Sequence, residues 1–326
     1  MNDSPAPEQL ARALLTYLAE LLQQPGLAYA EAPARIAQGL QSYVYGFKLR
    51  GRDLPGPWAG PLVFRVSQRA PGPNVQRDAE VQRFVAGLGY PAPQALAVQP
   101  AGGPLETSLM VMERLAGAPL SRRIVRKNLS AVRRLASRFA DTHVQLHRLR
   151  SDGWPSSSAE PAVERQLARF RALPSRPSEI AELLNWLEDK RGLVEREERS
   201  VCHNNFHPAN ILLDRDGRMS VLDWSNADVG DRHQDVAATF VLLRTAPRRR
   251  ANPQNRLLEP LCRSVFTRTY FSAYRGMLPI EMGRLHYWEV LRALEYWFAL
   301  ASYGLNEAWR GDLLRYARKR QRMISP

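Results

Sequence analysis

The spacing of hydrophobic positions changes near residue 120, which predicts two parts with different secondary structure. The first part opens with leucines at helical spacing, up to the stop at Pro25-Gly26, and this amphipathic helix is expected to pack on the domain. Segments 36–50, 61–67, 95–98 and 108–112 are predicted strands separated by Gly- and Pro-rich connections. One helix, predicted over 78–88, lies between them.

The rest of the chain is predicted to be mostly helical. From Ser121 onward, a long helical stripe is followed by a Pro- and Ser-rich break over 152–161 and by helices near 162–172 and 178–191. Short strands come next, and aromatic-rich helices close the chain. We therefore expect an α+β fold of two lobes, residues 1–113 with the leading helix and residues 114–326, within one domain.

The composition is that of an ordinary globular protein. The 326 residues are 44% hydrophobic and 24% charged, which allows a large core. No apolar run is long enough to cross a bilayer, and residues 1–24 lack the basic start and continuous apolar stretch of a signal peptide. Cys202 and Cys262 are too few for a disulfide framework. We expect a cytoplasmic protein with no membrane partner; its oligomeric state is left open.

The net charge of +14 is compatible with a nucleic-acid or membrane-surface binder, or with attraction of anionic small substrates. Arginines recur through most of the chain, with local clusters at 248–250 and 315–322. No basic motif interleaved with aromatic residues occurs, so we expect no specific nucleic-acid partner. A nucleic-acid-associated protein stays a third class, which strong salt-dependent retention on DNA would support.

One segment carries the most specific chemistry in the sequence. Residues 203–212 read HNNFHPANIL, and VLDW follows at 221–224. The turn at 214–217 joins two short apolar strands into a predicted hairpin, which would present Asn210 and Asp223 on one side. Amide and carboxylate oxygens are hard ligands of the kind that Mg²⁺ prefers. A capping Asn and a strand-end Asp in an unrelated hairpin are the alternative.

These motifs together resemble the aminoglycoside phosphotransferase and choline kinase superfamily, the small-molecule relatives of protein kinases. The resemblance extends from Ile36 to the C-terminus; it rests on 203–212, Asp223-Trp224, Gly230-Asp231 and Asp235-Val236-Ala237, with support from 80–93, 111–114 and Gly117. It implies a two-lobed kinase-like fold with ATP, or another nucleoside triphosphate, bound between the lobes and Mg²⁺ on Asn210 and Asp223. It also implies a small-molecule hydroxyl acceptor, and a buried Asp235 that braces the catalytic loop.

The resemblance further assigns nucleotide-binding residues in the first lobe. Arg65 and Glu80 match the strand lysine and helix glutamate that pair near the phosphates; arginine keeps the charge and adds a two-pronged fork. A solvated Arg and Glu are the alternative. The glycine-rich loop would include Gly39 and Ser42, and the linker that contacts the base would be Met112, Glu113 and Arg114.

Asn205 stands where the family has its catalytic Asp, and together with His203 it forms the predicted catalytic pair. An amide cannot accept the proton of a substrate, but it can orient a hydroxyl group. The chain is then a natural pseudoenzyme, a slow or differently arranged kinase, or a kinase with an introduced substitution. We expect an ATP-dependent phosphotransferase acting on a small-molecule hydroxyl group; a catalytically dead nucleotide- or ligand-binding protein is the alternative.

Two further groups of residues bear on ligands. The pairs His143/His147 and His203/His207 have i, i+4 spacing, but no third ligand is evident in the sequence, so structural histidines are favoured over zinc ligands. The acceptor wall is expected at the aromatic-rich segment 287–298, with Glu289 and Glu295 as polar contacts. The basic balance favours a neutral or anionic acceptor.

Overall fold

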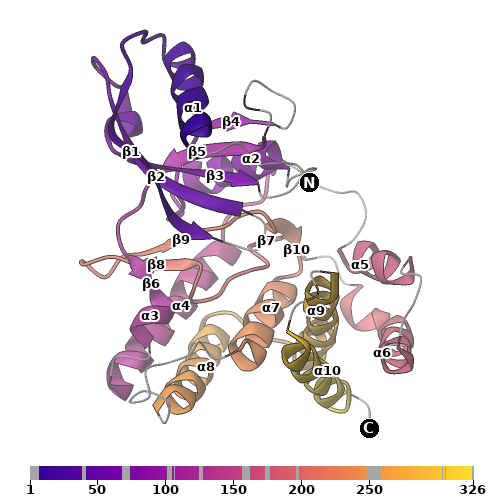
Figure 1. Cartoon of the computed structure of the whole chain (residues 1–326). Helices are drawn as coiled ribbons and strands as arrows, with labels where there is room; N and C mark the ends of the chain where they lie inside the picture. Colours follow the sequence, from indigo (N-terminus) through magenta and orange to yellow (C-terminus); the bar gives the residue numbers. More distant parts are fainter. Residues whose placement is uncertain are drawn as a thin grey trace. The chain divides into compact units, whose positions relative to one another are not determined.

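The computed structural model describes residues 7–38, 42–67, 74–100, 105, 107–124, 128–155, 162–172, 177–195, 198–247, 258–302, 304 and 306–324 (Figure 1). They form two compact units. The first is Met1–Gly117 with Ser220–Ser225, and the second is Ala118–Met219 with Asn226–Pro326. The sequence analysis placed a boundary at 113/114, and it did not predict that a short later segment packs with the first unit.

The first unit is built on a five-stranded antiparallel sheet of order β1-β2-β3-β5-β4. Its strands are β1 (Ala28–Gln38), β2 (Ser42–Arg50), β3 (Pro61–Ser67), β4 (Ala95–Gln99) and β5 (Leu109–Glu113), and a 3₁₀ turn, η1 (Gly56–Ala59), precedes β3. The single strand predicted over 36–50 is therefore two strands. β1 lies at the sheet edge with mostly exposed side chains, so it lacks the hydrophobic alternation that would have identified it.

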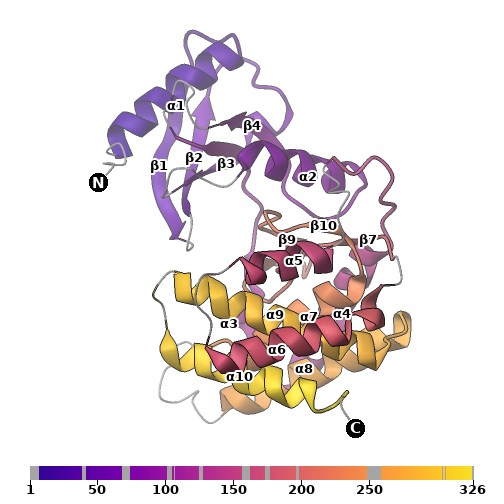
Figure 2. The ribbon, with the colours of Figure 1, turned by 90° about the vertical axis from the view of Figure 1, so that its right-hand side faces the viewer.

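A helix covers each face of this sheet. Successive strand residues point to opposite sides, so hydrophobic residues at neighbouring positions give both faces an apolar surface for a helix to cover. One face contacts α1 (Pro7–Leu21), and the other contacts α2 (Val75–Gly87) (Figure 2). The core beside α1 includes Leu10, Leu14, Leu18, Leu62, Phe64, Leu109 and Val111. Met110, between Leu109 and Val111, instead joins Ala79 of α2. The N-terminal helix is thus part of the core of its unit.

The second unit is mostly helical. Its helices are α3 (Leu120–Ile124), α4 (Leu129–His147), α5 (Ala162–Arg171), α6 (Ser178–Asp189), α7 (Arg232–Thr245), α8 (Leu258–Met277), α9 (Met282–Ser302) and α10 (Glu307–Gln321), with a 3₁₀ turn η2 (Arg191–Val194). Its short strands are β6 (Ala118–Pro119), β7 (Ser200–Cys202), β8 (Ile211–Leu213) and β10 (Asp228–Gly230), with β6 paired to β8 and β7 to β10. Strand β9 (Met219–Val221) lies where the chain passes from the second unit into Ser220–Ser225 of the first. The predicted α+β class, with a strand-rich and a helical part, is confirmed.

Helix α7 is the centre of the helical unit. Every residue from His233 to Leu243 is buried, and the helix contacts α8, α9 and α10. Its first turn carries Asp231 and Asp235 of the sequence motif. The side chain of Asp231 caps the helix by accepting the His233 N–H at 2.9 Å. No helix in the described part of the chain is long and apolar enough to cross a membrane.

Candidate active site

The loop between β7 and β8 carries the residues of the principal motif, and Asp235 holds its backbone in place. The carboxylate of Asp235 accepts the backbone N–H of His203 at 2.6 Å and that of Asn204 at 2.8 Å. Asp235 has no exposed surface. Since α7 is itself rigidly packed, its first turn fixes the start of the loop. The contact that the resemblance implied for Asp235 is present.

Two buried histidines of α4 lie against the carboxylate of Asp235. His143 Nε2 lies 3.1 Å and His147 Nε2 3.3 Å from Asp235 Oδ2, while their Nδ1 atoms lie 2.9 and 2.6 Å from the hydroxyls of Tyr270 and Tyr274. Burial alone would raise the pKa of Asp235, but His143 and His147 lower it well below its usual range. Burial and the neighbouring His143 lower the pKa of His147 to about 4. At neutral pH, neutral His147 therefore donates from Nε2 and accepts from Tyr274.

This network supplies the third group that the sequence did not reveal beside His143 and His147. The two imidazoles and Asp235 lie close enough to hold a metal ion. However, the Asp235 oxygens already accept backbone N–H groups, and both imidazoles have tyrosine partners on their other nitrogen. All three side chains are buried. These contacts favour structural histidines, although His143 Nε2, 3.1 Å from Asp235, makes no hydrogen bond of good geometry.

Asn204 is held in a left-handed conformation by contacts that the sequence did not reveal. Its φ is 59°, which is uncommon for residues other than glycine but tolerated by asparagine. Its Oδ1 accepts from Arg292 of α9 at 2.7 Å, and its Nδ2 donates to the Asn226 carbonyl at 3.0 Å. Together with the Asp235 bond, these contacts fix the residue before Asn205 on three sides.

His203, Asn205 and Asn210 form the inner part of the loop. The Asn205 N–H donates to His203 Nδ1 at 3.2 Å, and the Asn205 carbonyl accepts from Asn210 Nδ2 at 3.1 Å. His203 has no exposed surface, and its ring accepts the Asn205 N–H within the loop; its catalytic role stays a prediction. Asn205 and Asn210 are half-buried. Among the described residues, none donates to Asn210 Oδ1, the oxygen predicted to bind a metal.

In the first unit, Arg65 joins two acidic residues that are far apart in sequence. Its Nη2 lies 2.5 Å from Asp78 Oδ2, and its Nη1 lies 3.2 Å from Asp223 Oδ1. Asp223 has a φ of 67° and a side chain that is 39% exposed, and it accepts from Ser225 Oγ at 2.9 Å. The sequence predicted Arg65 and Asp223 separately; the structure places the two side chains in contact.

The segment 220–225 is fastened to the first unit on both sides of Asp223. The Val221 N–H donates to the Pro91 carbonyl at 2.7 Å. Trp224 is buried, and its ring meets the edge of Tyr90 at 5.6 Å between ring centres. Arg77 donates to the Ser225 carbonyl at 3.2 Å. These contacts hold the backbone of Asp223 in a conformation that few residues adopt.

The expected pairing of Arg65 with Glu80 is wrong, because the acidic partner on α2 is Asp78. Residues two positions apart lie on nearly opposite sides of a helix. Asp78 is 3% exposed and faces the sheet, whereas Glu80 is half-buried and accepts from Gln76 at 2.7 Å. Burial raises the pKa of Asp78, and the charge of Arg65 and its hydrogen bond counteract this only in part.

This correction gives a matched pair of variants. We expect Asp78→Asn to lower the free energy of unfolding by about 2–3 kcal/mol, because it removes a charge-assisted bond inside the unit. Glu80→Gln should change it by less than about 0.5 kcal/mol, since that side chain makes only a helix-surface contact. Urea denaturation followed by tryptophan fluorescence measures both. Equal losses in the two variants would restore Glu80 as the partner.

The remaining predicted nucleotide-binding residues lie at strand ends in the first unit. Met112 and Glu113 end β5; Met112 Sδ lies 3.7 Å from Gln82 Nε2, and Glu113 Oε1 accepts the Gln94 N–H at 2.7 Å. The next residue, Arg114, is exposed, and its backbone N–H donates to the Pro61 carbonyl. Ser42 begins β2, opposite Ser67 of β3. Gly39 lies outside the described residues.

The predicted acceptor wall on α9 is largely core. Tyr287 and Trp288 are 0% and 2% exposed; Tyr287 donates to the Leu187 carbonyl and Trp288 Nε1 to Asp231. Glu289 is 1% exposed and is paired with His286 at 2.7 Å and Arg320 at 3.0 Å. Because α9 is packed against both α7 and α10, Glu289 is a structural ion-pair partner rather than an accessible contact. Glu295 is half-buried and pairs with Arg292 at 2.6 Å.

The fold and these motifs define a class of proteins. In the strand-rich unit an arginine pairs with a carboxylate on a helix, and in the helical unit a buried aspartate braces a loop. The combination is that of a kinase-like phosphotransferase fold. The model of the phosphotransferase enzyme family (APH) matches residues 35–277. The chain belongs to that family.

Solved structures support the fold. Aminoglycoside phosphotransferase APH(4)-Ia aligns over 97% of this chain and 100% of its own, with a TM-score of 0.70 at 16% identity. A choline/ethanolamine kinase family protein from Mesorhizobium loti aligns over 98% and 96%, with a TM-score of 0.63 at 17% identity. Amicoumacin kinase hAmiN gives a TM-score of 0.61 at 12% identity over 95% and 94%. No curated protein matches the chain in sequence.

Proposed function

We propose that the chain binds ATP and transfers its terminal phosphate to a hydroxyl group of a small molecule. The observation that carries this proposal is the braced loop, in which Asp235 holds the backbone before Asn205 and the Asn210 amide oxygen accepts no bond from the described residues. Phosphoryl transfer depends mainly on positioning and charge stabilisation. Solved neighbours of the same fold contain ADP or AMP-PNP with hygromycin B.

The donor atoms fit magnesium. Asn210 Oδ1 and the partly exposed carboxylate of Asp223 are hard oxygen ligands, and each is on a backbone held by several hydrogen bonds. When bound, Mg²⁺ would neutralise charge on the phosphates. Arg65 lies next to Asp223 and carries a fork suited to phosphate oxygens, so its proposed role is to bind the nucleotide phosphates.

The alternative, a non-catalytic nucleotide- or ligand-binding protein, is favoured by one observation. Asn205 has no ionisable group where the family has a general base, so the chain lacks the usual acceptor for the hydroxyl proton. Within the proposal, Asn205 instead orients the acceptor hydroxyl by a hydrogen bond, and turnover is slow. The two candidates share nucleotide binding and differ only in turnover.

Two measurements test the proposal. A thermal-shift titration should show stabilisation by magnesium with ATP, reaching about 2.7 kcal/mol at a hundred times Kd. Asp223→Asn and Asn210→Ala should each weaken this effect about tenfold or more in Kd, while Asp216→Asn, an exposed turn residue, should not. Phosphate transfer to a panel of hydroxylated small molecules then separates an enzyme from a binding protein. No nucleotide-dependent shift in the natural chain would refute both candidates.

A further inference from the structure

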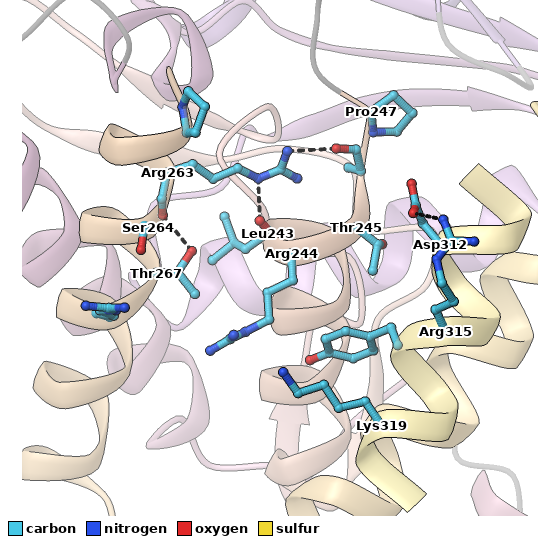
Figure 3. A pocket seen from close by; sticks show the side chains of 14 residues that line it. Leu243, Arg244, Thr245, Pro247, Arg263, Ser264, Thr267, Asp312, Arg315 and Lys319 are labelled. Carbon is cyan, nitrogen blue, oxygen red and sulfur yellow. Dashed lines mark hydrogen bonds and ion pairs between the residues drawn. The ribbon is translucent and has the colours of Figure 1, made fainter. Parts of the chain in front are cut away.

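A cavity of about 620 Å³ lies in the helical unit at the C-terminal end of α7. Its walls come from that helix end, from the first half of α8 and from α10 (Figure 3). Asp235, which braces the catalytic loop, stands ten residues before Thr245 of the cavity, or about 15 Å along the helix axis. The cavity is therefore separate from the loop that carries Asn205.

Basic residues dominate the cavity lining, which contains Arg244, Arg263, Arg268, Arg315 and Lys319. One acidic residue, Asp312, lines it too, and it is paired with Arg315 at 2.5 Å. Arg263 has a structural task. Its guanidinium donates to the carbonyls of Leu242 at 2.9 Å and Ala246 at 2.8 Å, and also to that of Leu243. It thus covers the negative end of α7, so that this end does not repel an anion in the cavity.

Three cations remain without an acidic partner. Among the described residues, no carboxylate pairs with Arg244, Arg268 or Lys319, and all three are exposed. Figure 3 shows the side chains of Arg244 and Lys319, which come from α7 and α10, among those that line the cavity. The exposed Ser264 hydroxyl lines the same space.

We propose that this cavity binds a small polyanion that carries two or more phosphate groups. Like charges gathered in a concave space repel one another, and a bound polyanion relieves that repulsion. Guanidinium forks suit phosphate oxygens, and the volume lies in the range of sites for small ligands. A nucleic-acid strand would instead use an extended groove with exposed aromatic stacking residues. Among the described lining residues the one aromatic side chain is Tyr316, which donates its hydroxyl to Glu289.

The test uses inorganic tripolyphosphate, titrated calorimetrically into the full chain at constant ionic strength without magnesium. Arg244→Gln combined with Lys319→Gln should raise Kd at least tenfold. The matched control, Arg133→Gln with Arg150→Gln, removes the same charge from two exposed residues outside the cavity and should change Kd less than twofold. All variants should keep the circular dichroism spectrum and melting temperature of the natural chain.

Two further arms separate the cavity from other binding. Arg65→Gln, in the first unit, should leave the cavity affinity unchanged; if this variant loses tripolyphosphate binding, the anion binds there and not in the cavity. If the cavity and control variants bind tripolyphosphate with equal affinity, binding depends on the net charge of the protein and not on the cavity. The second probe is a single-stranded oligonucleotide. If it binds more tightly than tripolyphosphate and the cavity variant weakens that binding, the ligand of the cavity is a nucleic acid and not a small polyanion.

Discussion

Asn205→Asp should raise the rate of phosphate transfer from ATP by about 10²–10⁴-fold, the usual contribution of a general base. The substitution leaves the backbone of residue 205 in place, with its hydrogen bonds to His203 and Asn210. Asparagine and aspartate also have nearly the same shape. The loop should therefore keep its conformation, and the gain should appear in kcat with little change in the nucleotide Kd. Steady-state kinetics with an accepted hydroxyl compound measures it.

The neighbouring residue supplies a matched control for this prediction. Asn204→Asp introduces the same charge one position earlier, but the side chain at residue 204 is engaged with Arg292 and the Asn226 carbonyl. It should give no gain in turnover. A gain in both variants would mean that added negative charge, rather than a base at residue 205, is responsible. No gain in either, with nucleotide binding intact, would favour a non-catalytic binding protein.

Asp235→Asn should lower the free energy of unfolding by about 3–5 kcal/mol, the cost of breaking a buried charged network. The carboxylate accepts from two backbone N–H groups and lies beside two imidazole Nε2 atoms. Asparagine has an NH₂ group where aspartate has its second oxygen. That NH₂ group would face other donors, so some of these donors would lose their acceptor. Chemical denaturation measures the loss. Asp216→Asn, at an exposed turn, should change stability by less than about 0.5 kcal/mol.

The same network predicts that acid destabilises the protein in two stages. The folded pKa of His147, about 4, is below its unfolded value near 6.5, so the unfolded chain binds the proton first. Stability therefore falls as the pH drops from about 6.5 to 4, by up to about 3 kcal/mol. Below that range Asp235 adds a further loss of stability. Its folded pKa is depressed, so its stabilising contribution is complete above its unfolded pKa and is lost as the pH falls toward the folded pKa. Stability that stays flat between pH 6.5 and 4 would contradict this account.

The sequence was most informative where chemistry depends on residue type and spacing. It predicted the fold class, the loop around Asn205, and Arg65 as the strand cation. It was least informative where the outcome depends on the rotation of a helix. Asp78 and Glu80 are both acidic and two residues apart, and only the packing of α2 on the sheet decides which one reaches Arg65. The prediction that Glu289 contacts the acceptor is wrong for the same reason. The local pattern of α9 does not show that α10 covers this side chain.

Contacts between distant polar residues were beyond the sequence as well. The bond from Arg292 to Asn204 joins residues 88 positions apart, and neither shows in its own neighbourhood that it has a polar partner. The histidines of α4 lacked a visible third group because Asp235 lies on α7. Strand β1 was missed for a different reason: an exposed edge strand does not need the alternating pattern that marks a half-buried one.

The attachment of Ser220–Ser225 to the first unit has a consequence for how the protein forms during translation. When residues 1–117 have left the ribosome, Tyr90 still lacks the ring of Trp224, and Arg65 still lacks one of its two carboxylates. The N-terminal unit therefore reaches its final state only after about two thirds of the polypeptide has been synthesised. Its strands are made first, but its last stabilising contacts arrive after about half of the helical unit, Ala118–Met219, has been synthesised.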